Sequence, residues 1–349
     1  MKSIDQIDTN FCVNSNLNKS NLKLYDSKNP PFEVFGLLRG DKKFCRIPDK
    51  TAMAVSEGVQ FLYANTAGGR VRFKTNSSCV AISASMEKLD KMSHFALTGS
   101  TGFDLYSDNV YVGTFIPPFD AQTGYESIIN LNNNSFKDIT INFPLYSDVN
   151  DLYIGLDLNA EIQKAEPYKN REPVVYYGSS ITQGGCASRP GMTYQSIISR
   201  RLDLDYINLG FSGSAKAEEE MSEYISNLAM SLFVYDYDHN APTWEYLMET
   251  HEKMFKKIRS AKPDIPIIIM SRPKYSLTKD ELKRRDIIKL TYENAIKSGD
   301  SNVYFIGGDE LMKICGDDGT VDGVHCTDLG FFSMAKALGD LMYEIILKQ

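Results

Sequence analysis

Short apolar runs alternate with long helical patterns from residue 174 to the end of the chain, and this alternation restricts the fold more than any other feature of the sequence. Strand and helix patterns in this order are typical of a parallel sheet that is covered by helices on both faces. The predicted strands are residues 174–177, 206–209, 232–236, 265–270 and 303–306, and the predicted helices are residues 193–202, 218–228, 244–260, 279–298 and 329–347.

Residues 32–158 follow a different pattern, in which short β-rich runs are separated by turn-forming clusters such as TAGG, KTNSS and NLNNNS. Because no long helical pattern intervenes, this half is predicted to be an antiparallel β-sandwich of the jelly-roll kind. The polar stretch 163–172 separates the two patterns, so we predict one domain over residues 1–165 and another over residues 172–349. The predicted strands of the first half are residues 32–38, 60–65, 70–74, 80–86, 109–115, 127–131, 138–143 and 152–158.

The charge balance restricts the partners of the chain. It has 38 Lys and Arg against 45 Asp and Glu, a net charge of −7, which argues against nucleic acid or an anionic membrane as the main partner. No apolar run approaches the roughly 20 residues of a membrane-spanning helix, and the first residues lack the apolar region of a signal peptide, so we expect a cytoplasmic protein. The expected partner is a small-molecule or oligosaccharide substrate, and assembly into a homo-oligomer stays open.

Cysteine and histidine are few. Six cysteines without a Cys-x-x-Cys pair predict neither a disulfide framework nor a zinc site, and we expect no metal and no other cofactor. The candidates for a histidine base are His94, His239, His251 and His325. His251 is expected to be solvated in the middle of a helix, whereas His94 lies far in sequence from the other polar clusters. Cys186 is expected to pack or to line a pocket.

Polar clusters follow successive predicted strands, and this is where a parallel sheet places its ligand site. GSSITQGG follows the first strand, so Ser180 is either a helix cap or a group whose neighbouring backbone N–H donors favour negative charge. NLGFSG follows the second strand, and its glycines either serve a turn or bring a backbone N–H close to a substrate oxygen. DYDHNAP follows the third strand, where His239 is a rival base but is expected to be a hydrogen-bonded loop residue.

The motif DGVH stands shortly before the last predicted helix. A carboxylate at Asp322, three residues before His325, can accept the Nδ1–H of the imidazole and hold it in the tautomer that a base requires. The preceding DDGTVD lacks the spacing and the terminal Glu of a calcium loop, so no calcium site is predicted there.

These four clusters, taken in this order, resemble the blocks of the SGNH (GDSL-like) hydrolase family. GSSIT, NLGFSG, DHN and DGVH correspond to the four blocks. The resemblance implies a three-layer α/β/α domain with a flavodoxin-like parallel sheet. It also implies that Ser180 is the nucleophile, that His325 is the base and that Asp322 orients the base. The backbone N–H groups of Ser180 and Gly213 and the side-chain amide of Asn240 would be the oxyanion donors.

The sequence departs from the family pattern in two places. Ser179 stands where the family name has aspartate, as in the GSSIT-type subgroup, so we expect the active-site turns to be braced differently or by water. The third block lacks the usual Gly-x-Asn-Asp, and its asparagine, Asn240, comes later.

A second resemblance lies in the first half. GFDLY at residues 102–106 is either a turn into a strand or, as its position suggests, the marker of the β-sandwich domain that precedes SGNH domains in some bacterial esterases. Together the resemblances imply a serine esterase that removes a short acyl group, such as acetyl, from a carbohydrate. Trp244 would then face a sugar or begin a helix as a core residue, and His239 is a further candidate for substrate binding. The alternatives are an acyltransferase or a lipid or thioester acylhydrolase on the same scaffold, and a carbohydrate-binding protein without activity.

Overall fold

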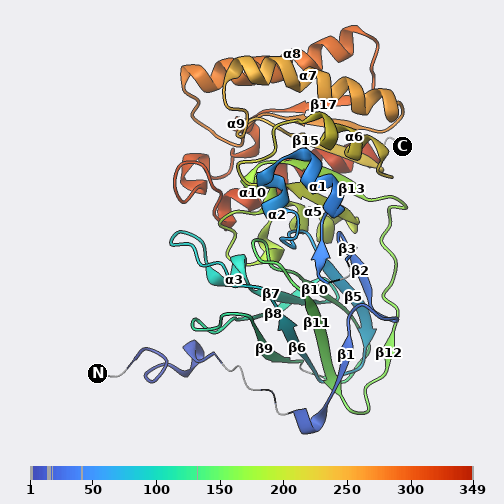
Figure 1. Ribbon diagram of the computed structural model, residues 1–349, viewed down its shortest axis with the longest axis vertical. Coiled ribbons are helices and arrows are strands. Elements are labelled where there is room, and N and C mark those ends of the chain that lie inside the picture. The colour runs from blue at the N-terminus through green and yellow to red at the C-terminus, as the bar shows by residue number, and fades with distance from the viewer. Residues whose placement is uncertain (1–2, 14–16, 18, 41, 132, 348–349) are drawn as a thin grey trace.

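The structure, a computed structural model, describes residues 3–13, 17, 19–40, 42–131 and 133–347. Antiparallel strands form one end of the molecule, and a parallel sheet with its helices forms the other (Figure 1). The two kinds of structure follow one another along the chain, as the change of sequence pattern predicts.

The parallel sheet aligns the carboxyl ends of its strands along one edge. Its five strands have the order β14-β13-β15-β16-β17. Gly178, the last residue of β13, pairs with Gly210 of β14 on one side and with Asp236 of β15 on the other. The loops after these three strands therefore begin side by side. The strands are β13 (Val174–Gly178), β14 (Tyr206–Gly210), β15 (Leu232–Asp236), β16 (Ile267–Met270) and β17 (Val303–Ile306).

Alternate residues of each parallel strand face two different hydrophobic layers. Val175 and Tyr177 belong to one cluster of buried residues, which includes side chains of α6, α7 and α8. Val174 and Tyr176 belong to a second cluster, which includes side chains of α5 and α10. The predicted three-layer α/β/α arrangement is thus confirmed. The helices of this half are α4 (Ser180–Gln183), α5 (Tyr194–Leu202), α6 (Glu219–Asn227), α7 (Trp244–Ala261), α8 (Lys279–Lys297), α9 (Gly308–Leu311) and α10 (Asp328–Leu347).

The antiparallel half consists of two sheets that enclose a third hydrophobic cluster. Val80 and Ile82 of β6 meet Val71 and Phe73 of β5 in this cluster, because alternate residues of each strand point inward. The antiparallel sandwich that the sequence predicts is therefore present. One sheet has the order β1 (Leu22–Asp26), β11 (Asp151–Asp157), β6 (Cys79–Ser85), β9 (Gly124–Asn130); the other has the order β12 (Ile162–Gln163), β5 (Arg70–Thr75), β10 (Lys137–Asn142), β7 (Phe103–Ser107), β8 (Val110–Phe115), with β2 (Glu33–Phe35) paired to β5.

One predicted strand is wrong. Residues 60–65 do not extend a sheet; their first part belongs to α2 (Glu57–Leu62), which follows α1 (Asp49–Val55). Ser56 caps α2, because its side chain accepts a hydrogen bond from the Val59 N–H. Val55, Val59 and Leu62 are buried in the same hydrophobic cluster as α6 and the parallel sheet. This burial against the second half of the chain overrides the local β propensity.

Residues 103–106 of the GFDLY segment lie in β7 and connect the two halves. The Asp104 carboxylate is fully buried and accepts hydrogen bonds from Asn142 Nδ2 (2.7 Å), Arg189 Nη1 (2.9 Å) and the Gly191 N–H (2.7 Å). Burial raises the pKa of Asp104, and these donors oppose the rise. The aspartate of the motif therefore holds the segment that leads from α4 to α5 against the β-sandwich.

The remaining described elements are short. They are η1 (Thr9–Phe11), η2 (Lys19–Asn21), β3 (Leu38–Arg39), β4 (Phe44–Cys45), α3 (Leu97–Ser100), η3 (Pro190–Met192) and η4 (Gly316–Gly319). No helix in the described ranges is both long enough and apolar enough to cross a bilayer.

Candidate active site

Ser180 begins α4 immediately beyond the carboxyl end of β13. A Cβ at Gly178 would lie 2.2 Å from Thr182 Oγ1 and 2.5 Å from Asp236 O, so only glycine permits this close turn from strand to helix. Ser179, which stands in place of the family's aspartate, caps the helix by accepting a hydrogen bond from the Ile181 N–H at 3.2 Å. The Ser180 residue is only 8% exposed. The turn thus fixes one serine hydroxyl at the edge of the sheet.

His325 and Asp322 meet Ser180 there. His325 Nε2 lies 3.0 Å from Ser180 Oγ, and His325 Nδ1 lies 2.7 Å from Asp322 Oδ2. Burial alone would raise the pKa of Asp322, but hydrogen bonds from the His325 side chain and from the N–H groups of His325 and Val324 lower it to about 2. The carboxylate is therefore ionised at neutral pH. The three side chains that the sequence predicts for a triad form one continuous chain of contacts.

Two backbone N–H groups beside Ser180 are free to bind a ligand. Among the described residues, neither the Ser180 N–H nor the Gly213 N–H donates a backbone hydrogen bond. Gly213 has a φ of +67°, which favours glycine, and it is exposed. The neighbouring Ser212 N–H donates to Gln183 Oε1 at 3.0 Å, and this bond ties the Gly213 loop to α4.

Asn240 lies in the same region but already has one partner. Its Nδ2 donates to Phe211 O at 2.9 Å, so the side chain crosses from the loop after β15 to the loop after β14. Because an amide nitrogen carries two hydrogens, one remains for a second acceptor. Asn240 can therefore hold the Gly213 loop and still donate to an oxyanion.

A buried polar network supports the nucleophile turn from below. Thr182 Oγ1 donates to Asp236 Oδ2 at 2.8 Å, and Asn208 Nδ2 donates to Thr182 O at 2.7 Å. Gln183 Nε2 reaches Asn65 Oδ1 of the first half at 3.1 Å. Burial raises the pKa of Asp236 to about 7, although the Thr182 hydrogen bond opposes the rise, and its Oδ1 has no partner. Sequence reasoning missed the partners in this network, because they come from segments far apart in the chain.

The third strand end does not supply a rival base. Asp238 receives hydrogen bonds from Arg272 and Arg284, which lower its pKa against the effect of burial. Burial, with the charge of Arg272, lowers the pKa of His239 to about 4. The expectation that His239 is a hydrogen-bonded loop residue is wrong for Nε2, which is buried without a partner.

Two other histidines differ from expectation. His251 is fully buried rather than solvated: its ring stacks on Tyr235 with centroids 4.5 Å apart, and Nδ1 lies 2.8 Å from Thr291 Oγ1. The charged neighbours in sequence lie on the other faces of α7. His94, distant in sequence, lies beside the triad: its ring centroid is 5.9 Å from that of His325. Only the packing of the two halves brings His94 and His325 together, so a sequence pattern cannot reveal this contact.

Trp244 is the first residue of α7 and is half-buried. Lys283 of α8 covers its ring, with Nζ 2.9 Å from the ring centroid. Trp244 therefore packs in part against a neighbouring helix, and its contact with a substrate stays a prediction.

A cleft of about 610 Å³ adjoins the Gly213 loop. Ser212 and Ser214 line one side, and Tyr146, whose Oη lies 3.4 Å from Ser180 O, lines it near the nucleophile. The first half of the chain supplies the rest, including Phe61 of α2. Phe61 is 66% exposed, and Lys88 Nζ lies 5.2 Å from its ring centroid. Both halves of the chain thus line this cleft, and Tyr146 connects it to Ser180.

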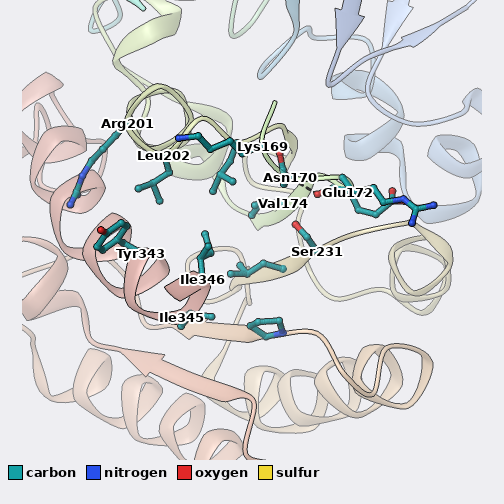
Figure 2. Close-up of a pocket in the computed structure, with 14 residues that line it drawn as sticks. Lys169, Asn170, Glu172, Val174, Arg201, Leu202, Ser231, Tyr343, Ile345 and Ile346 are labelled. Carbon is teal, nitrogen blue, oxygen red and sulfur yellow. Dashed lines mark hydrogen bonds between the residues drawn. The ribbon is translucent and has the colours of Figure 1, made fainter. Parts of the chain in front are cut away.

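A separate cavity of about 430 Å³ lies at the opposite edge of the parallel sheet (Figure 2). It is lined by Val174 and Leu232, which begin β13 and β15, and by Tyr343 and Ile346 of α10. Because Ser180 follows the other end of β13, this cavity is remote from the triad along the strand.

The comparisons with known proteins follow the same division of the chain. Residues 171–343 match the model of the GDSL-like lipase/acylhydrolase family, and residues 22–162 match the model of the GxDLY domain, described as the N-terminus of SGNH hydrolase-type esterases. No curated protein is found to match the chain by sequence.

Among solved structures, a protein from Bacteroides ovatus described as a GDSL-like lipase is 28% identical, with a TM-score of 0.83 over 93% of this chain and 98% of that one. A salicylyl-acyltransferase from a tetracycline biosynthetic pathway is 18% identical (TM-score 0.76; 93% and 97% covered), and a family two carbohydrate esterase from Cellvibrio japonicus is 12% identical (TM-score 0.63; 93% and 98% covered). The last two show the fold alone. On the family match, residues 171–343 belong to the GDSL-like lipase/acylhydrolase family, and the chain is a carboxylic ester hydrolase.

Proposed function

We propose that this esterase removes acetyl or other short acyl groups from a carbohydrate through a covalent acyl-enzyme. The observation that carries the proposal is the contact chain from Ser180 Oγ through His325 to Asp322, with distances of 3.0 and 2.7 Å. A serine hydroxyl becomes a useful nucleophile only when a base can take its proton as it attacks, and a carboxylate on the far nitrogen stabilises the imidazolium that forms.

In the first step, His325 Nε2 takes the Ser180 proton while Oγ bonds to the ester carbonyl carbon. The tetrahedral intermediate carries its charge on the former carbonyl oxygen. The N–H groups of Ser180 and Gly213, together with the second amide hydrogen of Asn240, would receive that oxygen. His325 then gives its proton to the leaving alcohol oxygen as the C–O bond breaks.

In the second step, water replaces the alcohol. His325 takes a proton from the water, the hydroxide oxygen bonds to the acyl carbon, and the bond from that carbon to Ser180 Oγ breaks. The proton returns to Oγ, so the enzyme is regenerated and the acid is released. The residues assigned here need no metal or organic cofactor for these proton transfers.

The cleft beside the Gly213 loop supports a carbohydrate as the alcohol. An exposed aromatic ring offers a flat apolar face of the kind that packs against a sugar ring. Phe61 presents such a ring in a cleft that also carries charged and polar side chains, among them Glu57 and Asp90. We therefore propose that Phe61, in addition to the earlier candidates Trp244 and His239, contacts the sugar.

The substrate proposal is tested by measuring kcat/KM on acetylated mono- and oligosaccharides and on p-nitrophenyl esters of increasing chain length. We expect the highest kcat/KM on acetyl esters, and we expect Phe61→Ala to raise KM for acetylated sugars without changing kcat/KM for p-nitrophenyl acetate. Phe136→Ala is the matched control, because Phe136 is also exposed but does not line the cleft. Turnover of long-chain esters without turnover of acetyl esters would overturn the substrate proposal, as would acyl transfer to an added alcohol in place of hydrolysis.

A further inference from the structure

Three metal-ligating side chains from distant segments converge beside the nucleophile. One nitrogen of His94, the Cys186 Sγ and one nitrogen of His325 all lie within 4.8 Å of one another. His94 comes from the β-sandwich half, Cys186 from the segment after α4, and His325 from the loop before α10. We propose that this cluster binds a thiophilic divalent cation such as Zn²⁺, and that the bound ion reversibly inhibits the esterase.

The ligand types fit this class of ion. Imidazole nitrogen and thiolate sulfur are the preferred donors for zinc, and hard cations such as Mg²⁺ and Ca²⁺ prefer oxygen. A tetrahedral site with bond lengths near 2.0–2.3 Å places its ligand atoms roughly 3.5 Å apart. The three atoms, within 4.8 Å of one another, would have to move together by roughly 1.3 Å at most to reach that spacing. The His94 side chain is 48% exposed, so a change of rotamer can bring it closer without repacking the core.

The charge around the cluster favours a cation. Asp322 Oδ2 lies 4.0 Å from His94 Nε2, and no Lys or Arg side chain forms an ion pair with Asp322 in the described part of the chain. On binding, the Cys186 thiol releases its proton to solvent, and the resulting thiolate bonds to the metal. The ion therefore meets one thiolate and has a carboxylate nearby.

Cys186 is half-buried and packs against the hydrophobic cluster that includes α5 and α10, as expected. It makes no disulfide, because all six cysteines are free. Burial and the nearby Asp322 charge raise the pKa of the thiol to about 11, so it is a poor nucleophile at neutral pH. Its φ of +73° is rare for a residue other than glycine and holds the side chain at this place in the fold.

The inhibition follows from the position of His325, and this part of the inference rests on the proposed function. If the ion bonds to Nε2, it occupies the lone pair that would take the Ser180 proton. If it bonds to Nδ1, it displaces the Asp322 contact that orients the ring. With the ion on either nitrogen, His325 cannot act as the base, and a chelator that removes the ion restores the activity.

Binding is tested separately from activity with the Ser180→Ala variant, which keeps all three ligands but has no nucleophile. Co²⁺ added to the metal-free variant is expected to produce a thiolate-to-metal absorption band in the near ultraviolet, and Zn²⁺ titrated by calorimetry is expected to bind one ion per chain. Cys186→Ser should abolish the band and weaken Zn²⁺ binding at least tenfold. Cys12→Ser, which changes an exposed cysteine outside the cluster, should alter neither.

Inhibition is tested on the active enzyme with p-nitrophenyl acetate in metal-buffered solution. Zn²⁺ should inhibit the wild type and the Cys12→Ser variant, and a chelator should restore both. Cys186→Ser should keep most of the uninhibited rate and require at least tenfold more Zn²⁺ for half-inhibition. His94→Gln should also raise the Zn²⁺ concentration needed for half-inhibition. Equal binding by the Cys186→Ser and Cys12→Ser proteins would overturn the metal site. Binding without inhibition would instead overturn the proposed role of His325.

Discussion

The two sides of the candidate active site are built in different ways. Ser180 stands on a turn whose neighbours Thr182, Gln183 and Asp236 are fully or almost fully buried, and hydrogen bonds from distant segments fix it. The His325 loop is half-exposed and is held by contacts within residues 320–326, including a bridge between Thr320 and Cys326. The nucleophile side is therefore part of the core, whereas the base side is a local turn. Substitutions on the two sides should differ in how far they change stability along with activity.

The largest expected effect is that of Ser180→Ala. The Ser180 hydroxyl contacts His325 and makes no hydrogen bond to the buried network, so its removal should abolish the chemistry and leave the fold intact. We expect kcat on p-nitrophenyl acetate to fall by roughly 10⁶-fold, with an unchanged midpoint of thermal unfolding. A variant that kept wild-type turnover would exclude Ser180 as the nucleophile.

Asp322→Asn should come next and should affect activity far more than stability. The amide cannot hold His325 in the same tautomer, so kcat should fall by roughly 10⁴-fold. Because the contacts of Asp322 are local and partly solvated, the midpoint of thermal unfolding should change by only about 2–3 °C. Calorimetry beside steady-state kinetics checks both values, and a large loss of stability would show that the loop is not the independent turn described above.

Asn240→Ala should have an intermediate effect, because Asn240 lies in the loop after β15, outside both the Ser180 turn and the His325 loop. Loss of one oxyanion donor should lower kcat by roughly 10²–10³-fold. Loss of its bond to Phe211 O also frees the Gly213 loop, so stability should fall by about 1 kcal/mol. An unchanged kcat combined with a lower stability would assign Asn240 a structural role only.

The smallest effect on activity, and a clear effect on stability, is expected for Asp236→Asn. In the folded protein Asp236 binds its proton up to about pH 7, whereas the ordinary value is 3.8. The stability contributed by the protonated carboxyl is therefore fully present below about pH 4 and is lost as the pH rises to about 7. Between pH 4 and pH 8, the free energy of unfolding of Asp236→Asn should therefore rise by roughly 2–4 kcal/mol relative to that of the wild type.

Urea unfolding of both proteins across that pH range checks the sign. Asp322, whose pKa is lowered rather than raised, provides the opposite case: its contribution to stability is present at neutral pH and is lost as the pH falls toward 2. If the wild type instead lost stability relative to Asp236→Asn as the pH fell, the network below Ser180 would not hold a protonated carboxyl.

Periodicity predicts a parallel sheet with helices on both faces, whereas the contact of Ser180, His325 and Asp322 follows from what the resemblance to SGNH hydrolases implies for these residues. It does not predict that His94 lies beside His325 or that His251 is buried, since both depend on packing between segments far apart in the chain. The helix α2 was missed because its burial is against α6 and the parallel sheet. The division at residues 165 and 172, the substrate and the roles of the site residues stay predictions.

The position of α1 and α2 has a consequence for protein engineering. Val55, Val59 and Leu62 complete the hydrophobic layer of the parallel sheet, although they precede it by more than a hundred residues. A shortened chain that started at residue 171 would leave this apolar surface open to water and prone to aggregation. Chimeras that exchange the β-sandwich between related enzymes should therefore keep the native residues 49–62, because this segment packs against the catalytic half.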